Sequence, residues 1–427
     1  MAGLARRLGL PELADQEEQL GLLWDELGRR DRWLLVYDNA SQPRDLAPYR
    51  PPAGRGHLLI TSRNPAWASM ATPLQVDVLS RAEAVAFVRA RLGRDEPAAG
   101  ELAAALRDLP LALEQAAAYL EQTHASLHDY LRLLGERAGE VLGLGELADY
   151  PHTVTTAWSL SLGRIRAEAP AAEDLLAVCA FLAADDIPRS LLAEQAAVLP
   201  NRLQQATADE LAYNRMLGEL GRYALMTVTE DALAVHRLVQ TVIREGFDQE
   251  AKQRWAGAAV RLLWAAFPED DVRAWPASAR LLPHVLAATE HASALDADGA
   301  LAADLLNKAA GYLWRRAELG QARQLSERAL TLLEAQLGPD HLDVALHLNN
   351  LGSVLSDLGE LSAARTACER ALAIRQAQLG PDHLDVAATL NNLGIILWRL
   401  GQLPAARTTF QRALAIRQAQ LGPTTST

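Results

Sequence analysis

The C-terminal third of the chain carries the clearest pattern of hydrophobic and polar positions. The segment GPDHLDVA begins at Gly338, recurs 42 residues later at Gly380, and starts again with Gly-Pro at Gly422. An internal period of this length is typical of helical solenoids, in which each unit stacks only on its neighbours. The sequence therefore predicts an α-solenoid of 42-residue units over residues 301–423.

Each unit contains two stripes of apolar and small residues at helical spacing, which predict a pair of packed helices. The small residues allow the two helices of a pair to approach closely. The spacing resembles tetratricopeptide repeats of the long, kinesin-light-chain-like type, and Leu306 to Ala329 supply a weaker first copy. The first-helix stripes are Leu348, Leu351, Gly352, Leu355 and Leu390, Leu393, Gly394, Leu397; the second-helix stripes are Ala364, Cys368, Ala371 and Ala406, Phe410, Ala413.

Polar residues at repeated positions suggest a binding groove for a protein or peptide partner. Asn349 and Asn391 each begin an Asn-Asn pair, and Arg365 and Arg407 stand on the partner helices. Carboxamides and guanidinium groups can hold an extended peptide through its backbone and side chains. The alternative is that one Asn of each pair caps a turn or is solvated.

Histidines in the loops of the repeat units are a second polar feature. His341 and His383 each follow an aspartate between two helices. This arrangement favours capping of the next helix over metal binding.

Near the N-terminus, two short apolar runs predict neighbouring β-strands. Trp33–Asn39 and Gly56–Asn64 read as two buried strands of a parallel sheet. Trp33–Tyr37 is continuously apolar, as expected for a strand covered on both faces, and Leu58–Ile60 is again short and apolar. Leu74–Val78 is a candidate third strand.

Polar side chains follow both predicted strands. Asp38 comes directly after the first, and Thr61, Ser62 and Arg63 follow the second. Ligands of open parallel sheets bind beyond the carboxyl ends of the strands. There Asp38 would hold Mg²⁺, and a hydroxyl pair with a guanidinium would contact a terminal phosphate. The alternative for Asp38 is an ordinary Asp-Asn turn.

The next region, residues 80–150, is predicted to be helical. Ser80 and Glu83 form a capping-box pattern at the start of one amphipathic helix, and Pro110 stands at the start of another.

The order of these motifs carries a resemblance. LLVYDN, LLITSRN and DLPLALEQAAAYL together resemble the NB-ARC nucleotide-binding switch of STAND-type signalling ATPases, in the bacterial form that carries tetratricopeptide repeats. The resemblance implies ADP or ATP with Mg²⁺ as ligand. It also implies that Asp38 serves the metal, Arg63 senses the γ-phosphate, and Pro110 packs against the base or ribose.

Two departures from that family limit the expected chemistry. The phosphate-loop pattern GxxxxGK[ST] is absent, and the only lysines are Lys252 and Lys308. Asn39 stands where many such ATPases carry a second acid, and Asn cannot accept a proton from water. We therefore expect at most a weak ATPase, and either a truncated gene product or a degenerate nucleotide domain.

Residues 151–247 are expected to form a winged helix. Several helices precede two short strands, Ala224–Val228 and Ala232–Val235. The run from Val235 to Gln240 is similar to the family motif whose histidine contacts the ADP β-phosphate, which implies this role for His236. The alternative is that His236 caps the following helix or packs in its core.

Residues 248–300 read as a helical connector. The aromatic residues in this segment are expected to make core contacts: Trp255, Trp264, Phe267 and Trp275.

Composition sets the remaining limits. A net charge of −12 and a pI near 5.4 argue against broad binding to nucleic acid or anionic membrane. The candidate recognition helix for DNA, Ala208–Tyr223, nearly balances its charges. No segment is apolar enough to span a bilayer, so a cytoplasmic location is expected. Cys179 and Cys368 lie in apolar helical contexts and are expected to be buried thiols.

The sequence as a whole predicts a mainly α chain. Its expected parts are a partial α/β region (1–79), a helical region (80–150), a winged helix (151–247), a connector (248–300) and the repeats (301–423). The leading hypothesis is an ADP/ATP-responsive signalling switch with partner-binding repeats, and the resemblance adds oligomerisation on activation. The alternatives are a nucleotide-independent scaffold and a winged-helix transcriptional regulator.

Overall fold

The structure is a computed structural model, and it confirms a mainly helical chain ending in a solenoid. The chain forms two compact units, Met1–Ala169 with Asn214–Thr227, and Pro170–Tyr213 with Val228–Thr427. Each unit is described by itself. The structure describes residues 2–11, 16–30, 32–38, 40, 42–51, 56–62, 64, 67–93, 97–136, 154–223, 225–268 and 272–421.

The first unit opens with a small helix-and-strand region. Strands β1 and β2 pair in parallel, with Leu34 opposite His57 and Tyr37 opposite Ile60. A small core of Ala5, Leu23 and Leu27 packs beside them with Trp33 at its edge. The elements are α1 (Ala2–Arg7), α2 (Gln16–Gly28), β1 (Leu34–Tyr37), α3 (Pro43–Leu46), η1 (Ala47–Tyr49) and β2 (His57–Ile60).

The strands differ from the prediction in their burial. Leu34, Val36 and Leu59 are 62%, 49% and 51% exposed, so the prediction of coverage on both faces is wrong. The candidate strand Leu74–Val78 is also wrong, because these residues form no strand and Leu74 is 88% exposed. In the described part of this unit the sheet has two strands, β1 and β2. A sheet of two strands offers little surface for other segments to pack on, so its apolar residues stay exposed.

The rest of the first unit is helical. The predicted capping box is confirmed at the start of α4, where Ser80 and Glu83 exchange hydrogen bonds. Val88, Leu102 and Leu113 are fully buried in the core of this region. Its elements are α4 (Arg81–Leu92), α5 (Ala99–Ala105), α6 (Pro110–Thr123), α7 (Leu127–Glu136) and α9 (Val154–Glu168).

The second unit begins with short helices around a three-stranded sheet of order β3-β5-β4. β3 pairs antiparallel with β5, and this two-residue strand was missed because Ile187-Pro188 reads as a helix start. The elements are α10 (Pro170–Cys179), β3 (Ile187–Pro188), α11 (Arg189–Glu194), η2 (Ala196–Val198), α12 (Asn201–Ala208), β5 (Ala232–Ala234) and α14 (Arg237–Glu245). The unit boundaries fall within α13 (Glu210–Arg222) and β4 (Thr227–Val228), so these two elements are divided between the units.

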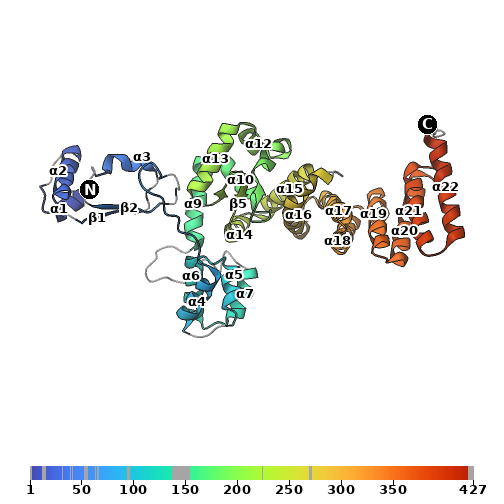
Figure 1. Ribbon diagram of the computed structural model, residues 1–427, viewed down its shortest axis with the longest axis horizontal. Helices are drawn as coiled ribbons and strands as arrows, with labels where there is room; N and C mark the ends of the chain where they lie inside the picture. The colour runs from blue at the N-terminus through green and yellow to red at the C-terminus, as the bar shows by residue number, and fades with distance from the viewer. Residues whose placement is uncertain are drawn as a thin grey trace. The chain divides into compact units, whose positions relative to one another are not determined.

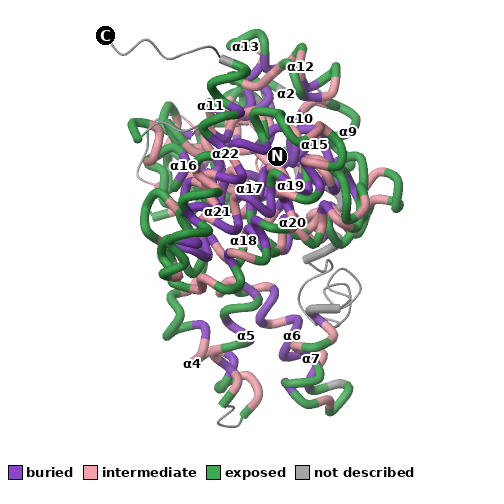
Figure 2. The backbone as a smooth tube through the Cα atoms, turned by 90° about the vertical axis from the view of Figure 1, so that its right-hand side faces the viewer, coloured by how far each residue is buried: buried purple, intermediate pink, exposed green. Residues whose placement is uncertain are grey.

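A connector and three helix pairs complete the second unit. The pairs follow one another in chain order, from orange to red in Figure 1, and Figure 2 shows their buried stripes in purple. The connector comprises α15 (Gln249–Ala266), η3 (Val272–Ala274) and α16 (Trp275–Leu295). The pairs are α17 (Gly299–Arg315) with α18 (Leu319–Leu337), α19 (Leu342–Asp357) with α20 (Leu361–Leu379), and α21 (Leu384–Arg399) with α22 (Leu403–Leu421).

Glycine allows the two helices of a pair to touch. A Cβ on Gly352 would lie 2.4 Å from Cys368 Sγ, and one on Gly394 would lie 2.6 Å from the Phe410 ring. The predicted role of small residues in close helix approach is therefore confirmed at both sites.

The histidines and cysteines behave as expected. His341 and His383 cap α19 and α21, each accepting a hydrogen bond at Nδ1 from a backbone N–H two residues on. Both cysteines are buried thiols, and burial raises the pKa of Cys179 and of Cys368 to about 12.

None of the described helices has the length and apolar character needed to cross a membrane.

Candidate functional site

Asp38 and Thr61 meet at the carboxyl ends of β1 and β2. The Thr61 hydroxyl donates a 2.6 Å hydrogen bond to Asp38 Oδ1, and both residues are exposed. Ser62 donates to the Ala40 carbonyl at 2.6 Å and thereby ties the two strand ends together. A carboxylate and a hydroxyl are hard oxygen ligands of the kind that Mg²⁺ prefers.

The structure brings together only part of the predicted nucleotide site. Arg63 and Asn39 lie outside the described residues. Pro110 is the first residue of α6, in a bundle with α4 and α7. His236 belongs to the second unit. Among the described residues, no group of three or more His, Cys, Asp or Glu side chains is placed to hold a metal ion.

His236 is the N-cap of α14. Its Nδ1 accepts a hydrogen bond from the Leu238 N–H at 3.2 Å, which is the capping alternative expected from the sequence. The helix that it caps is anchored deep in the unit, because Gln240 donates to the Cys179 carbonyl at 2.8 Å and Arg244 donates to the Ala180 carbonyl. Burial lowers the pKa of Arg244 to about 10.

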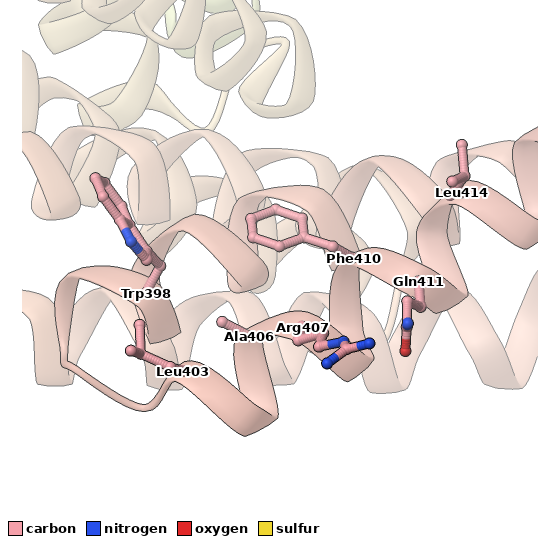
Figure 3. A pocket seen from close by; sticks show the side chains of 7 residues that line it. All are labelled: Trp398, Leu403, Ala406, Arg407, Phe410, Gln411 and Leu414. Carbon is pink, nitrogen blue, oxygen red and sulfur yellow. The ribbon is translucent and has the colours of Figure 1, made fainter.

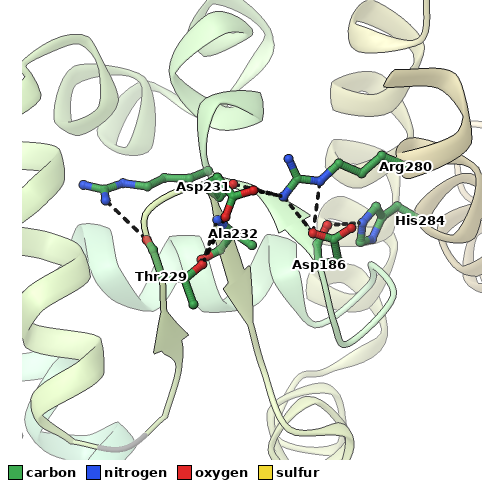
Figure 4. Close-up of polar contacts among 7 residues, drawn as sticks. Asp186, Thr229, Asp231, Ala232, Arg280 and His284 are labelled. Atoms are coloured by element: carbon green, nitrogen blue, oxygen red, sulfur yellow. Dashed lines mark hydrogen bonds and ion pairs between the residues drawn. The ribbon is translucent and has the colours of Figure 1, made fainter. Parts of the chain in front are cut away.

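A polar cluster joins the three-stranded sheet to α16 (Figure 4). Arg280 donates to Asp186 Oδ1 at 2.7 Å and to the Asp231 carbonyl at 3.0 Å. His284 is buried, and its Nε2 lies 3.1 Å from the Asp186 carbonyl. Burial lowers the pKa of His284, so the neutral imidazole is favoured there. The cluster fixes α16, and with it the start of the array, to the sheet.

Polar contacts connect the first helices α17, α19 and α21 with one another and with α15. At the α15 end of this row, Trp264 donates to Asp304 at 2.6 Å, and Lys308 lies over the Trp264 ring at 4.2 Å. His347 Nε2 lies 3.9 Å from Asp304. The interactions with His347 and Trp264 hold the pKa of Asp304 below its ordinary value. Trp264, predicted to be a core residue, is 37% exposed, whereas Trp255 and Phe267 are buried as expected.

The middle of the row is a ladder of asparagines. Asn350 donates to Asn307 Oδ1 at 3.4 Å, and Asn392 donates to Asn349 Oδ1 at 3.1 Å. Each bond joins residues 43 positions apart, so it links one repeat to the next. Asn349 is only 8% exposed, and its amide oxygen is used by this ladder.

The far end of the row centres on Asp357. Trp314 donates to Asp357 Oδ2 at 2.8 Å, and Arg399 donates to Oδ1 at 2.9 Å. We call the whole row the first-helix seam. Its members are Trp264, Asp304, Asn307, Lys308, Trp314, His347, Asn349, Asn350, Ser353, Asp357, Asn392 and Arg399.

The predicted partner-binding residues divide between two surfaces. Asn349 is part of the first-helix seam, and Asn391 is half-buried on α21 beside seam residue Asn392. Arg365 pairs with Glu369 on the second helix α20 at 3.4 Å, and Arg407 is exposed on the second helix α22. The arginines therefore lie on second helices, away from the ladder.

Sequence reasoning missed most of the seam. Asn307 precedes Asn349 by one 42-residue period, and extending the Asn register into the weaker first copy would have found it. Asp304 and Asp357 gave no such signal, because their residue type does not recur one period later, where Leu346 and Arg399 stand, and Trp264 lies outside the repeats.

Two family models match parts of the chain. The Tetratricopeptide repeat model matches residues 301–367 and 343–419. A Domain of unknown function (DUF7779) matches residues 164–252, which contain the three-stranded sheet and α14.

A curated relative covers most of the chain. It is a "Nucleotide-binding leucine-rich repeat (NLR)-like protein" from Hyaloscypha variabilis, 26% identical over 357 residues. The match takes in 74% of this chain and 35% of the relative, so the chain spans about a third of the relative's length.

The similar solved structures have low sequence identity to this chain and low TM-scores. BtubC (BKLC) from P. vanneervenii is 18% identical, with 56% of this chain and 92% of that chain covered and a TM-score of 0.35. A STAND protein with a tetratricopeptide repeat sensor from Pyrococcus horikoshii is 13% identical, with 95% and 65% covered and a TM-score of 0.26. TM-scores this low do not establish a shared arrangement of the whole chain.

Proposed function

We propose that this chain, a STAND-type protein with C-terminal tetratricopeptide repeats, is a regulatory protein whose repeat array binds an extended segment of a protein partner. The observation that carries the proposal is the first-helix seam, whose polar contacts link α15 to α17, α17 to α19 and α19 to α21. Tetratricopeptide repeats generally mediate protein–protein interactions, and the seam offers chemistry suited to a peptide.

The seam combines the groups that such recognition needs. Asp304, Asp357 and Arg399 are partly exposed, with side chains 38%, 46% and 34% accessible. Carboxylates accept hydrogen bonds from backbone N–H groups and lysine side chains, and amides both donate and accept. The Trp264 ring adds a half-exposed apolar surface.

The seam side chains are also held in place before any partner arrives. Asp357 accepts from two helices at once, and Asp304 is fixed by Trp264. Side chains that are already ordered lose less conformational entropy on binding, which raises affinity.

A peptide selection tests where such a segment binds. Peptides selected from a random library on the full chain are bound back to it, and backbone hydrogen exchange is measured. Protection should appear on α15, α17, α19 and α21. Protection confined to the second helices α18 and α20 would exclude the seam as the binding surface.

A second candidate function is nucleotide control by the first unit, as an ADP/ATP-responsive switch. The observation in its favour is the hydrogen-bonded pair Asp38–Thr61 at the carboxyl ends of the parallel strands β1 and β2. The Asp38 carboxylate and the Thr61 hydroxyl could bind Mg²⁺ and one phosphate group of a nucleotide. The chain has no glycine-rich loop with lysine to hold the remaining phosphates, so the residues present fit the nucleotide only in part.

Under this second candidate, His236 would contact the ADP β-phosphate in the resting state, and oligomerisation would follow activation. Its capping role at α14 supports a fixed position for the imidazole. Replacement of His236 by Asn, which also caps helices, would separate the two roles. It should preserve folding and weaken ADP binding in a protein that carries the phosphate loop. Unchanged ADP affinity would remove His236 from the site.

A further inference from the structure

A carboxylate and an uncovered leucine share one place on the first-helix seam. Asp304 and Leu346 hold the same position in successive repeats, 42 residues apart, on α17 and α19. The two residues lie near each other, because Nε2 of His347, the neighbour of Leu346, is 3.9 Å from Asp304 Oδ1. Both reach solvent: the Asp304 side chain is 38% exposed and Leu346 is 41% exposed.

Leu346 lies on the face of α19 that carries the seam. From Leu346 to Asp357 the residues that reach solvent recur every three or four positions, and the residues between them are buried. The other members of this stripe are Asn350, Ser353 and Asp357, all of which belong to the seam. Since α19 contacts a first helix on each side, α17 and α21, the exposed leucine is a property of an interior repeat.

The Asp304 carboxylate is charged and held in place. The hydrogen bonds with His347 and Trp264 keep the pKa of Asp304 below its ordinary value, so the carboxylate is anionic at neutral pH. Its Oδ2 accepts from Trp264 Nε1 at 2.6 Å. A charge that is already fixed can be paired by an incoming cation with little further loss of side-chain entropy.

Lys308, one helical turn further along α17, supplies a cation to the same corner of the seam. Its Nζ lies over the Trp264 ring at 4.2 Å and 3.5 Å from the Trp264 carbonyl oxygen. In the described part of the chain no hydrogen bond or ion pair joins this ammonium to Asp304. The exposed part of the carboxylate therefore stays open to a cation from outside.

We propose that Asp304 and Leu346 form a subsite for a lysine side chain of the partner segment. This role rests on the proposed function, because it requires a segment bound along the first-helix seam. The lysine ammonium pairs with the Asp304 carboxylate, and its methylene stem packs on Leu346.

Lysine fits this place better than arginine. A bidentate pair with a guanidinium needs both carboxylate oxygens, and Trp264 already uses Oδ2. Stacking of a guanidinium on the indole is prevented as well, because Lys308 covers the ring. A compact ammonium needs only one oxygen and an apolar surface for its stem.

The subsite is separate from the apolar pocket on the last helix pair. That pocket has a volume of about 400 Å³ and is lined by side chains of α21 and α22 (Figure 3). None of its lining residues belongs to α17 or α19. Changes at Asp304 and Leu346 therefore leave the pocket unaltered.

Selection from a random peptide library on the full chain supplies the probe. Peptides that bind should share a lysine at one position, and the same selection on Asp304→Asn should lose this preference. Asn still accepts the hydrogen bond from Trp264, so the substitution removes the charge and keeps the local contact. Glu327→Gln, which removes a partly exposed carboxylate on α18, is the control and should keep the preference.

Calorimetry with a synthetic selected peptide tests the charge. Norleucine in place of the lysine keeps an aliphatic stem and removes the ammonium, and it should weaken binding to the wild-type chain about three- to tenfold. The same replacement should make little further difference in Asp304→Asn, because both changes remove one ion pair.

A second analogue tests the stem. Diaminopropionic acid in place of the lysine keeps an ammonium on a short stem, and it should weaken binding about threefold or more. It should make little further difference in Leu346→Ser. Leu337→Ser on α18, at a leucine that is 38% exposed, is the control and should leave the affinity for the peptide unchanged.

Lys308 distinguishes a basic partner from an acidic one. Lys308→Met removes a like charge beside the subsite, so the affinity for the peptide should stay unchanged or rise by up to about threefold. A loss of affinity would overturn the subsite, because the peptide would then offer a carboxylate to Lys308.

Failure of the subsite and failure of the proposed function give different results. Peptides that protect the seam helices from hydrogen exchange but share no lysine would overturn the subsite alone. Fully additive losses for norleucine and Asp304→Asn would do the same, because the lysine would then bind elsewhere. No peptide binding, or protection confined to α18 and α20, would remove the seam as the binding surface and the subsite with it.

Discussion

At the scale of single residues, the polar positions of this chain mostly serve neighbouring repeats. Asn349, which the sequence suggested for peptide binding together with Asn391, is the clearest case, because its amide oxygen accepts a hydrogen bond from Asn392 of the next repeat. His341 and His383 cap helices, as the adjoining aspartates suggested. The ladder could not be predicted, because a single sequence does not show which of two adjacent asparagines faces the next helix.

The two asparagines at 391 and 392 should have separable effects. Asn392→Ala leaves the buried oxygen of Asn349 without its donor, and we expect a loss of about 1–2 kcal/mol in the free energy of unfolding. Asn391→Ala should change the stability by less than about 0.5 kcal/mol. Urea unfolding of both variants checks the difference. Equal losses would contradict the ladder.

His291 should make the stability of the second unit depend on pH. Burial, together with the nearby Arg244, lowers its pKa to about 4, and its ring packs edge-on against Phe181. Because the folded pKa lies below the unfolded value of about 6.5, the unfolded chain takes up the proton first as pH falls. Stability is therefore full above pH 7 and is lost towards pH 4, by about 1–2 kcal/mol between pH 7 and pH 5.

Thermal unfolding from pH 7 to pH 5 measures this effect. His291→Gln should remove that part of the pH dependence, whereas the same change at exposed His128 should not. If the stability of the wild-type protein and that of His291→Gln depend on pH in the same way, His291 is not a source of the pH dependence.

At the scale of elements, the helix pairs and the parallel pairing of β1 with β2 were predictable, and the burial of these two strands was not. The 42-residue period and the small residues at Gly352 and Gly394 give the helix pairs directly. The strands at Leu34 and Leu59 were expected to be covered because they are apolar. Apolar residues show only that burial is favourable, and whether anything covers them depends on distant parts of a protein.

The close contact in the second pair gives a prediction. Gly352→Ala places a methyl group 2.4 Å from Cys368 Sγ, so α19 and α20 must move apart, and we expect a loss of about 1–3 kcal/mol. Gly311→Ala in α17 is the control, because its Cβ would meet only the Arg315 side chain, at 3.6 Å. It should be neutral or stabilising by up to about 1 kcal/mol.

Chemical denaturation of the two glycine variants decides the matter. If Gly352→Ala is as stable as Gly311→Ala, the helix pair α19–α20 can accommodate a methyl group beside Cys368, and the predicted clash is wrong.

At the scale of the whole molecule, the chain combines a small region of helices and parallel strands with a helical repeat array. Asp38 and Thr61 lie together as the strand order suggested, but the sequence holds no phosphate loop. We therefore predict that this chain by itself binds neither ADP nor ATP, with or without Mg²⁺, at protein concentrations up to the millimolar range. Stoichiometric binding of a fluorescent ADP analogue would contradict the prediction.

The central claim is that partners bind along the first-helix seam. The most direct test compares two variants in the affinity for a peptide selected on the full chain. Asp357→Ala removes a seam carboxylate that is 46% exposed and paired with Arg399. Glu327→Ala removes a carboxylate on α18 that is 47% exposed and paired with Arg323. The two changes match in charge, exposure and ion pairing. They differ in the surface that they alter and in the hydrogen bond that Asp357 also accepts from Trp314.

Calorimetry of this pair gives the decisive number. We predict that Asp357→Ala raises the dissociation constant of the peptide more than about tenfold, whereas Glu327→Ala changes it less than about twofold. Equal affinities for the two variants would contradict recognition on the seam.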